Sequence, residues 1–302
     1  MADQDAWLAI VNPAAGGGRC GKQFPAACER LRQGGMTVDV AQTHGPGEAS
    51  AIARAAWHEG RRRFIAVGGD GTGFEIVNGL FPAATDSAVK PRLGFLPMGT
   101  GNSFLRDFTE QGAEHSIGAL LEGRWRECDV ARLHHRAGIM HWINILSIGF
   151  VADVNGLRAR RFRSWGEFGY VAAVVTAVAG LRSRPFPLRC DGGETDGGKM
   201  VFASFNNSRF TGGKMMMAPH ADTADGLVDF IRVGPLGRLS LLATFPKIFS
   251  GKHLLNPAVR ESKHKTIEFD VSDEIDVMID GEAERVIPRA IDVLPAALEV
   301  CV

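Results

Sequence analysis

The arrangement of apolar runs changes near residue 130, and this change constrains the fold more than any other feature of the chain. Before it, stretches of helical pattern alternate with short β-branched runs, which cover residues 7–11, 37–42, 63–67 and 92–97. Strands that alternate with helices at this spacing form a parallel sheet with helices on both faces. We therefore predict an N-terminal α/β domain over residues 1–130.

Beyond residue 130, strands follow one another with fewer helices between them. Two runs alternate cleanly, so that Ile267, Phe269 and Val271 share one face and Ile275, Val277 and Ile279 share another. Such alternation is typical of a half-buried antiparallel sheet. We predict a mostly antiparallel β-sandwich over residues 131–292, interrupted by helical stretches near 164–181 and 237–251, and we allow the terminal segment 293–302 to complete the first domain.

Charge and cysteine content exclude several classes of protein. Lys plus Arg and Asp plus Glu are each 34, so no global field attracts nucleic acid, and we expect none as a partner. The five cysteines are odd in number and lack a CxxC spacing, which indicates reduced thiols in a cytoplasm. The longest apolar stretch, residues 170–181, is shorter than the roughly 20 residues of a membrane-spanning helix.

Three glycine-rich turns follow predicted strands, at residues 12–19 (NPAAGGGR), 68–72 (GGDGT) and 97–103 (PMGTGNS). Ligands of parallel sheets bind at the carboxyl ends of the strands. Glycines let the backbone approach phosphate oxygens closely, and helix N-termini add partial positive charge. We predict a nucleotide-phosphate site formed by Asn12, Pro13, Gly16, Arg19, Gly68, Gly69, Gly71, Thr72, Gly99, Thr100, Gly101 and Asn102.

Two common nucleotide motifs match the first turn formally. Gly16, Gly18 and Gly21 fit a dinucleotide fingerprint, but four residues that include Pro13 separate the strand from the first of these glycines. The same segment fits a P-loop pattern ending at Lys22, but Gln23 replaces the hydroxyl residue that should bind Mg²⁺. We disfavour both interpretations.

Two carboxylates stand out next to these turns. Asp70 lies at the carboxyl end of a strand, where it is placed to hold Mg²⁺ on nucleotide phosphates, although it could instead cap the helix that begins near Thr72. Glu282 follows a strand end and a glycine within the acidic turn IDGE at 279–282, which displays it for chemistry or leaves it as an ordinary hairpin residue.

These four turns, in this order, resemble the diacylglycerol kinase and sphingosine kinase family of lipid kinases. The resemblance extends to NNSRFTGGKMMMAPHADTADGLVDF at 206–230 and so covers nearly the whole chain. It implies a phosphofructokinase-like nucleotide site, ATP and Mg²⁺ as cofactors, and transfer of a phosphoryl group to a diacylglycerol-like or sphingoid lipid hydroxyl. A soluble-acceptor kinase of the NAD kinase type and an inactive lipid-binding module remain the alternatives.

The resemblance also implies roles for single residues. Glu282 corresponds to the base that takes the proton of the acceptor hydroxyl, and Asp129 to an aspartate coupled with Asp70. Asp225 corresponds to a ligand of a structural Mg²⁺, while we interpret the nearby His220 as a loop residue. The lipid head group is expected near Asp153 and Asn155, although an amide at 155 binds a protonated amine less well than a carboxylate does.

A basic run precedes the apolar stretch that ends at residue 181. It comprises Arg158, Arg160, Arg161 and Arg163 and is followed by aromatic residues. Anionic head groups attract such cations, and aromatic side chains anchor at head-group depth. We therefore expect a cytoplasmic protein that contacts the inner face of a membrane through this run; a homodimer is a further open expectation.

Overall fold

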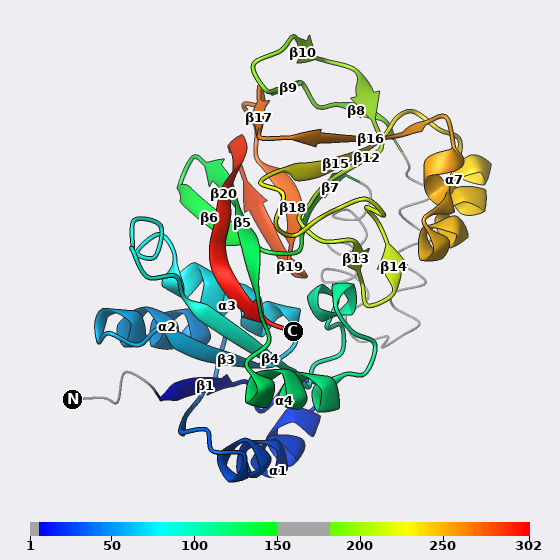
Figure 1. Cartoon of the computed structure of the whole chain (residues 1–302). Helices are drawn as coiled ribbons and strands as arrows, with labels where there is room; N and C mark the ends of the chain where they lie inside the picture. Colours follow the sequence, from blue (N-terminus) through cyan, green and yellow to red (C-terminus); the bar gives the residue numbers. More distant parts are fainter. Residues whose placement is uncertain (1–5, 150–181) are drawn as a thin grey trace.

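The structure is a computed structural model that describes residues 6–149 and 182–302. The predicted head-group residues Asp153 and Asn155, the arginine run at 158–163 and the helical stretch at 164–181 lie outside the described residues. Figure 1 shows an α/β layer, drawn in blue and cyan, beside a β-rich part drawn in green to red.

The first half has the layered α/β arrangement that the sequence predicts. Its elements are β1 (Trp7–Val11), α1 (Arg19–Gln33), β2 (Val38–Gln42), α2 (Glu48–His58), β3 (Arg63–Gly68), α3 (Asp70–Leu80), β4 (Arg92–Pro97), η1 (Phe104–Asp107), α4 (Ala113–Glu122), β5 (Trp125–His135) and β6 (Gly138–Trp142). Strands β2, β1, β3 and β4 pair in parallel in that order. Their carboxyl ends, and the loops that follow them, therefore lie at one edge of the sheet.

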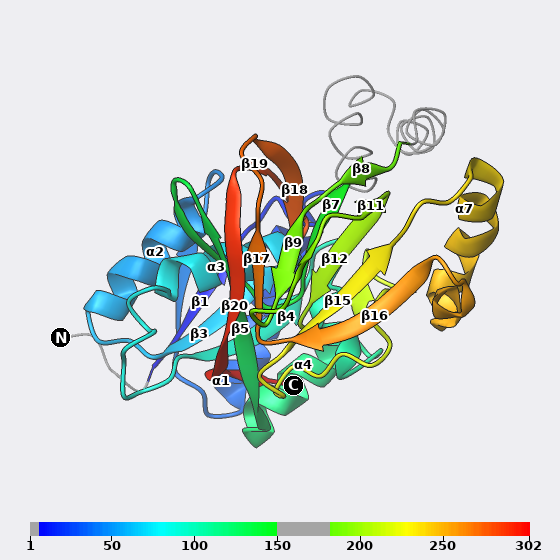
Figure 2. The same ribbon diagram turned by 90° about the horizontal axis from the view of Figure 1, so that it is seen from above.

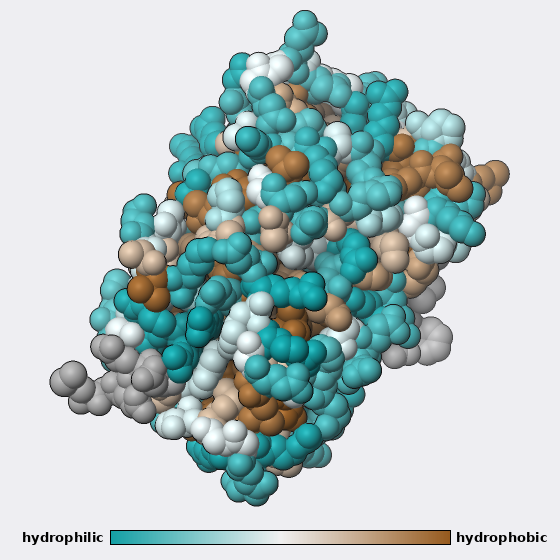
Figure 3. Space-filling view, viewed as in Figure 1, coloured by the Kyte–Doolittle hydropathy of each residue, from teal (hydrophilic) through white to brown (hydrophobic). Residues whose placement is uncertain are grey.

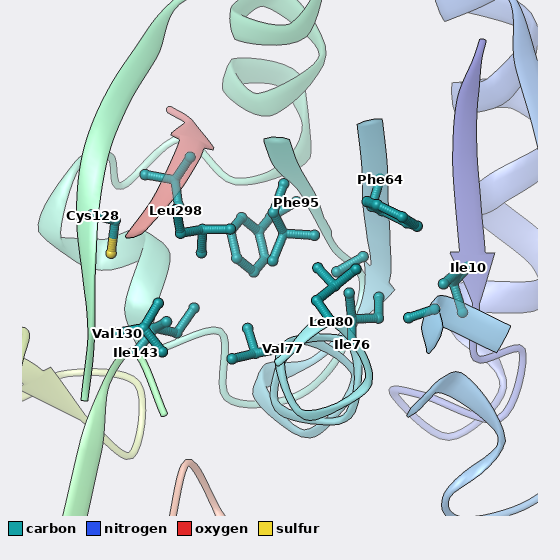
Figure 4. Packing of buried hydrophobic residues seen from close by; sticks show 14 of the residues in the cluster. Ile10, Phe64, Ile76, Val77, Leu80, Phe95, Cys128, Val130, Ile143 and Leu298 are labelled. Atoms are coloured by element: carbon teal, nitrogen blue, oxygen red, sulfur yellow. The ribbon is translucent and has the colours of Figure 1, made fainter. Parts of the chain in front are cut away.

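Helices cover both faces of the parallel sheet (Figures 1 and 2). One face packs against α2 and α3; Figure 4 shows Ile76, Val77 and Leu80 of α3 beside Phe64 and Phe95 of the sheet. The other face packs against α1 and α4, and α1 buries Cys20, Phe24, Ala27, Cys28 and Leu31, which recur at helical spacing. All five residues of β1 are buried, as expected for a strand covered on both sides.

The second half adds β7 (Ile145–Gly149), β8 (Arg184–Pro185), β9 (Leu188–Cys190), β10 (Thr195–Asp196), β11 (Lys199–Met200), β12 (Phe202–Asn206), β13 (Phe210–Thr211), β14 (Met215–Met216), β15 (Val228–Val233), α7 (Arg238–Thr244), η3 (Phe245–Ser250), η4 (Lys252–Leu255), β16 (Val259–His264), β17 (Thr266–Phe269), β18 (Ile275–Ile279), β19 (Glu282–Val286) and β20 (Pro288–Cys301). Six of these strands form an antiparallel sheet in the order β16, β15, β12, β7, β18, β19.

The last strand, β20, joins the two halves of the chain. Residues Glu299–Cys301 pair in parallel with β4, while the strand as a whole runs antiparallel to β5 and its first part also pairs with β17. A ten-stranded sheet therefore extends from the α/β layer into the second half, and Figure 1 shows β20 in red across this junction.

The six-stranded sheet packs against this extension to form a β-sandwich. The core between the sheets contains Ile267 and Phe269 of β17 and Val277 and Ile279 of β18, with Val271 and Ile275 partly buried at its margin. The alternation that predicted an inward face for these residues is confirmed.

The outer face of the six-stranded sheet is covered by α7, η3 and η4, which we call the cap (residues 238–255). Ile248 of the cap lies in one hydrophobic cluster with Phe202, Ile231 and Val259 of the sheet. The helical stretch expected at 237–251 thus corresponds to α7 and η3. Within the described residues, no helix is long and apolar enough to cross a membrane.

Candidate active site

A pocket of about 480 Å³ lies at the carboxyl edge of the parallel sheet. All three glycine-rich turns contribute to its wall, and so does the acidic turn of the second half. Of the predicted site residues, those that line it are Asn12, Gly16, Gly69, Gly71, Thr72, Gly99, Thr100 and Glu282. The structure thus brings together four segments that are separated by up to 270 residues in the sequence.

The second and third glycine turns touch through their backbones. A Cβ atom on Gly99 would lie 2.4 Å from the Cα atom of Gly69 and 2.6 Å from its nitrogen, so no side chain fits at position 99. Arg19 connects the first turn to the third, because its Nε donates to the Gly16 oxygen at 3.1 Å and its Nη2 donates to the Gly99 oxygen at 3.5 Å. The three turns therefore form one connected wall.

Asp70 does not cap its own helix. The N-cap of α3 is Gly69, without a side-chain hydrogen bond, and Asp70 is the first helical residue. Its carboxylate instead accepts hydrogen bonds from the backbone N–H groups of Ser103 at 2.9 Å and of Phe104 at 3.4 Å. Burial raises the pKa of Asp70 above its usual value, and these hydrogen bonds oppose that rise. Asp70 thus fixes the third turn against the start of α3.

A tight hairpin presents Glu282 to the same place. Asp280 and Gly281, which connect β18 to β19, have φ angles of 44° and 94°, as a two-residue type I′ turn requires. The Asp280 carboxylate is buried and accepts hydrogen bonds from the backbone N–H groups of residues 143–145 at 2.9–3.1 Å. These bonds anchor the hairpin to the start of β7.

The charge of Asp70, in the second glycine turn, affects Asp280 in the acidic turn. Burial and, to a smaller extent, the negative charge of Asp70 raise the pKa of Asp280 to about 7, against the hydrogen bonds from residues 143–145, which lower it. The sequence analysis did not select Asp280 as a site residue. Its place directly before Gly281 and Glu282 in the acidic turn was the available signal, but its backbone partners at 143–145 lie far away in the sequence.

Glu282 lies against the N-terminus of α3. A Cβ atom added to Gly71 would be only 2.5 Å from Oε1 of Glu282, so the carboxylate occupies the space that a side chain at 71 would need. Partial burial raises the pKa of Glu282, and the charges of Glu75 and Glu284 raise it further. A carboxylate with a raised pKa is a stronger base than an ordinary surface glutamate.

The sequence analysis missed one wall of the pocket. Thr43, His44, Gly45 and Pro46, in the loop between β2 and α2, line it. This loop also follows a strand of the parallel sheet and contains two glycines, which was the signal that could have found it. Glu75, the next acidic residue of α3, accepts hydrogen bonds from the backbone of Gly47 at 2.9 Å and Ala49 at 3.0 Å and so holds the start of α2.

The coupling expected between Asp129 and Asp70 is not present in the hydrogen bonds of this structure. Asp129 is buried, and its two oxygens accept from the backbone N–H groups of Gly226 at 2.6 Å and Ala296 at 2.7 Å. These contacts attach β5 to the loop before β15 and to β20. Asp129 is not among the residues that line the pocket, and its coupling with Asp70 stays a prediction.

Asp225, predicted as a ligand of a structural metal, pairs with a lysine. Its Oδ2 lies 2.6 Å from Nζ of Lys263, while Oδ1 accepts from the Leu227 N–H group. His220 pairs with Glu261 at 2.5 Å on the surface, in keeping with a loop residue. Among the described residues no cluster of three or more His, Cys, Asp and Glu side chains could hold a metal ion.

Two family models and several named proteins match the chain. The diacylglycerol kinase catalytic domain model matches residues 6–133, and the model of the YegS C-terminal NAD kinase beta sandwich-like domain matches residues 144–302. A diacylglycerol kinase of Mycobacterium tuberculosis is 32% identical over 299 residues, which are 97% of this chain and 93% of that protein. A diacylglycerol kinase of Staphylococcus aureus is 26% identical over 281 residues, 90% of this chain and 84% of that protein.

The fold also has a counterpart among solved structures. The crystal structure of a diacylglycerol kinase from Bacillus anthracis str. Sterne superposes with a TM-score of 0.73 at 21% identity, covering 100% of this chain and 98% of the other. This likeness concerns the fold, while the two domain matches and the mycobacterial relative establish kinship along nearly the whole length. The chain therefore belongs to the diacylglycerol kinase family of lipid kinases.

Proposed function

We propose that this kinase transfers the γ-phosphoryl group of ATP to the free hydroxyl of diacylglycerol or a closely related neutral lipid. The observation that carries the proposal is the placement of Glu282 at the N-terminus of α3, on the wall of a pocket built from three glycine turns. Phosphoryl transfer depends mainly on positioning and charge neutralisation, with a base that orients the attacking hydroxyl.

The glycine turns suit the triphosphate. Gly69 and Gly71 flank the start of α3, where backbone N–H groups and the helix dipole favour anions. Gly16 has a φ angle of 61°, and a side chain there would meet the Met98 oxygen at 2.6 Å, so this backbone must stay bare. Arg19 supplies a fixed positive charge beside the first turn.

Glu282 is the group we assign as the base. In this role it accepts the proton of the lipid hydroxyl while the oxygen attacks the γ-phosphorus and the bond to the β-phosphate oxygen breaks, leaving ADP. Its raised pKa favours that role. Asp280 contributes by position, because its hydrogen bonds to residues 143–145 hold the hairpin that carries Glu282.

The acidic side chains fit Mg²⁺ bound with the nucleotide. Asp70 and Glu282 supply hard carboxylate oxygens, and among the described residues neither has a Lys or Arg in its hydrogen bonds. Mg²⁺ in kinases needs one or two carboxylates besides phosphate oxygens and water, so no larger protein cluster is required. Bound there, the ion would neutralise the charge that develops on the phosphates, with Asp70 as the residue that holds it.

The acceptor is proposed from the relatives, which are named diacylglycerol kinases. A panel of diacylglycerol, monoacylglycerol, ceramide, sphingosine and NAD, each offered with γ-labelled ATP, tests it. We expect label in diacylglycerol above all others. Preferential labelling of ceramide or sphingosine would move the substrate to the sphingoid class, and labelling of NAD alone would overturn the lipid assignment. Asp70→Asn is the matched inactive control.

A further inference from the structure

The cap carries an unusual amount of exposed apolar surface. Within the described residues, nine large hydrophobic side chains are exposed, and five of them are Leu239, Leu242, Phe245, Phe249 and Leu255 of the cap. Leu239 is 84% and Leu255 is 77% exposed. Figure 3 shows hydrophobic surface on the side of the molecule where Figure 1 draws α7. Apolar patches of this kind mark surfaces that meet another apolar phase or partner.

The outward direction of these side chains is fixed by the opposite face of the cap. Leu241, Ile248 and Leu254 point inward, onto the hydrophobic cluster of the six-stranded sheet. Nε2 of His253 lies 2.9 Å from the Met217 oxygen, and Nδ2 of Asn256 donates to the Thr244 hydroxyl at 2.7 Å. The cap is therefore apolar on two faces, of which the fold buries one.

The charges of the cap all have one sign. Exposed Arg238, Lys247 and Lys252 lie among the exposed leucines and phenylalanines, while residues 235–260 contain no Asp or Glu. Cations among apolar side chains complement the anionic head groups and acyl chains of a lipid surface. A second copy of the same face would instead bring like charges together.

The cap is also connected to the active site. The β13–β14 hairpin lies between them, with Met216 beside Gly251 of the cap. At its other end the Gly213 N–H group donates to the Ser103 hydroxyl at 2.9 Å, and the Ser103 N–H group donates to Asp70. A lipid surface on the cap would therefore lie close to Met215 and Met216 of this hairpin, whose other end contacts the third glycine turn.

We propose that the outer face of the cap docks the enzyme on membranes rich in anionic lipid, so that acceptor lipid enters from the bilayer along the β13–β14 hairpin. Docking goes beyond the proposed reaction, and vesicle binding without ATP tests it independently of turnover. The proposal rests on the described residues 238–255 and makes no use of the arginine run at 158–163.

The test compares two variants that each lose four exposed hydrophobic side chains. The cap variant carries Leu239→Ser, Leu242→Ser, Phe249→Ser and Leu255→Ser; the control carries Val40→Ser, Val89→Ser, Leu121→Ser and Ile139→Ser, all exposed elsewhere. On vesicles of phosphatidylglycerol and phosphatidylcholine, we expect the partition coefficient of the cap variant to fall by roughly tenfold or more relative to the wild type. We expect near-normal partition for the control. Equal partition of cap variant and wild type would overturn the proposal.

Two further measurements identify the occupant. Lys247→Gln with Lys252→Gln should weaken partition roughly tenfold on the anionic vesicles but leave it unchanged on phosphatidylcholine alone. In the wild-type chain, anionic vesicles should protect Lys247 and Lys252 from acetylation while the exposed Lys22 of α1 stays reactive, which requires no variant to fold. If Lys247 and Lys252 resist acetylation without vesicles and the protein has a dimeric mass in solution, the face binds a second copy of the chain, and the proposal is overturned.

Discussion

Gly71→Ala is expected to separate activity from stability, because it displaces the carboxylate of Glu282 without straining the backbone. The new methyl carbon would lie 2.5 Å from Oε1 of Glu282, whereas ordinary contacts begin at 3.4 Å, so the carboxylate must move by about 0.9 Å. The obstacle is the end of a flexible side chain, which can give way. A misplacement of about 1 Å in a catalytic group reduces turnover by roughly a hundredfold.

Gly71→Ala should stabilise the fold while it lowers turnover. Gly71 lies in the first turn of α3, and replacing a helical glycine with alanine stabilises a helix by about 0.5–1 kcal/mol. Gly118→Ala is the matched control, since Gly118 lies in α4 and the nearest side-chain atoms, of Arg124 and Glu122, are 3.8 Å and 3.9 Å from the added carbon. We expect Gly118→Ala to raise the thermal midpoint slightly and to leave turnover unchanged.

The assay measures kcat, KM for ATP and the thermal unfolding midpoint of both variants. Our interpretation predicts that Gly71→Ala lowers kcat, keeps the midpoint at or above the wild-type value, and changes KM for ATP little. Wild-type kcat in Gly71→Ala would refute the catalytic role of Glu282 at this position. A large rise in KM alone would show that the methyl group obstructs the nucleotide and that the position of Glu282 does not limit the reaction.

The remaining predictions concern the same turns and one distant carboxylate. Asp70→Asn should lower turnover by roughly a hundredfold or more with the fold intact; activity within about tenfold of wild type would make Asp70 a purely structural residue. Glu282→Gln should lower kcat by roughly 10²–10⁴ with little change in ATP affinity, and parallel losses in both would place it in the nucleotide site. Gly99→Ala should lower the unfolding midpoint, because its methyl would meet the Gly69 backbone, which cannot give way. Burial raises the pKa of Asp229 to about 7, so the native state holds a proton that the unfolded chain has lost, and stability should fall as pH rises from about 4 to about 7. Asp229→Asn should reduce the difference in denaturant midpoint between pH 5 and pH 8, which an unchanged difference would contradict.

Local sequence patterns predicted the elements and the glycine turns. Burial could be predicted from the five apolar residues of β1 and from the alternation at 267–271. The reason is that successive side chains of a strand point to opposite faces of the sheet, so the apolar pattern shows which faces are buried. The turns at 12–19, 68–72 and 97–103 were predictable as one site since loops after parallel strands share an edge.

Contacts between distant backbone groups could not be predicted in this way. Asp70 accepts from residues 103 and 104, Asp280 from residues 143–145, and Asp129 from residues 226 and 296. A carboxylate that binds remote N–H groups has the same sequence signature as one that binds a metal or caps its own helix. For the same reason the sequence predicted a role for Asp129 and none for Asp280, although the pKa of Asp280 is raised in part by the charge of Asp70.

The most direct test of the central claim is a crystal structure with a non-hydrolysable ATP analogue and Mg²⁺. We predict that the triphosphate lies in the 480 Å³ pocket between Gly16, Gly71 and Gly99, with the γ-phosphate between α3 and the Glu282 carboxylate. Binding of the triphosphate elsewhere, for example in the 310 Å³ pocket that Arg232, Arg260 and His264 line in the β-rich part, would contradict it.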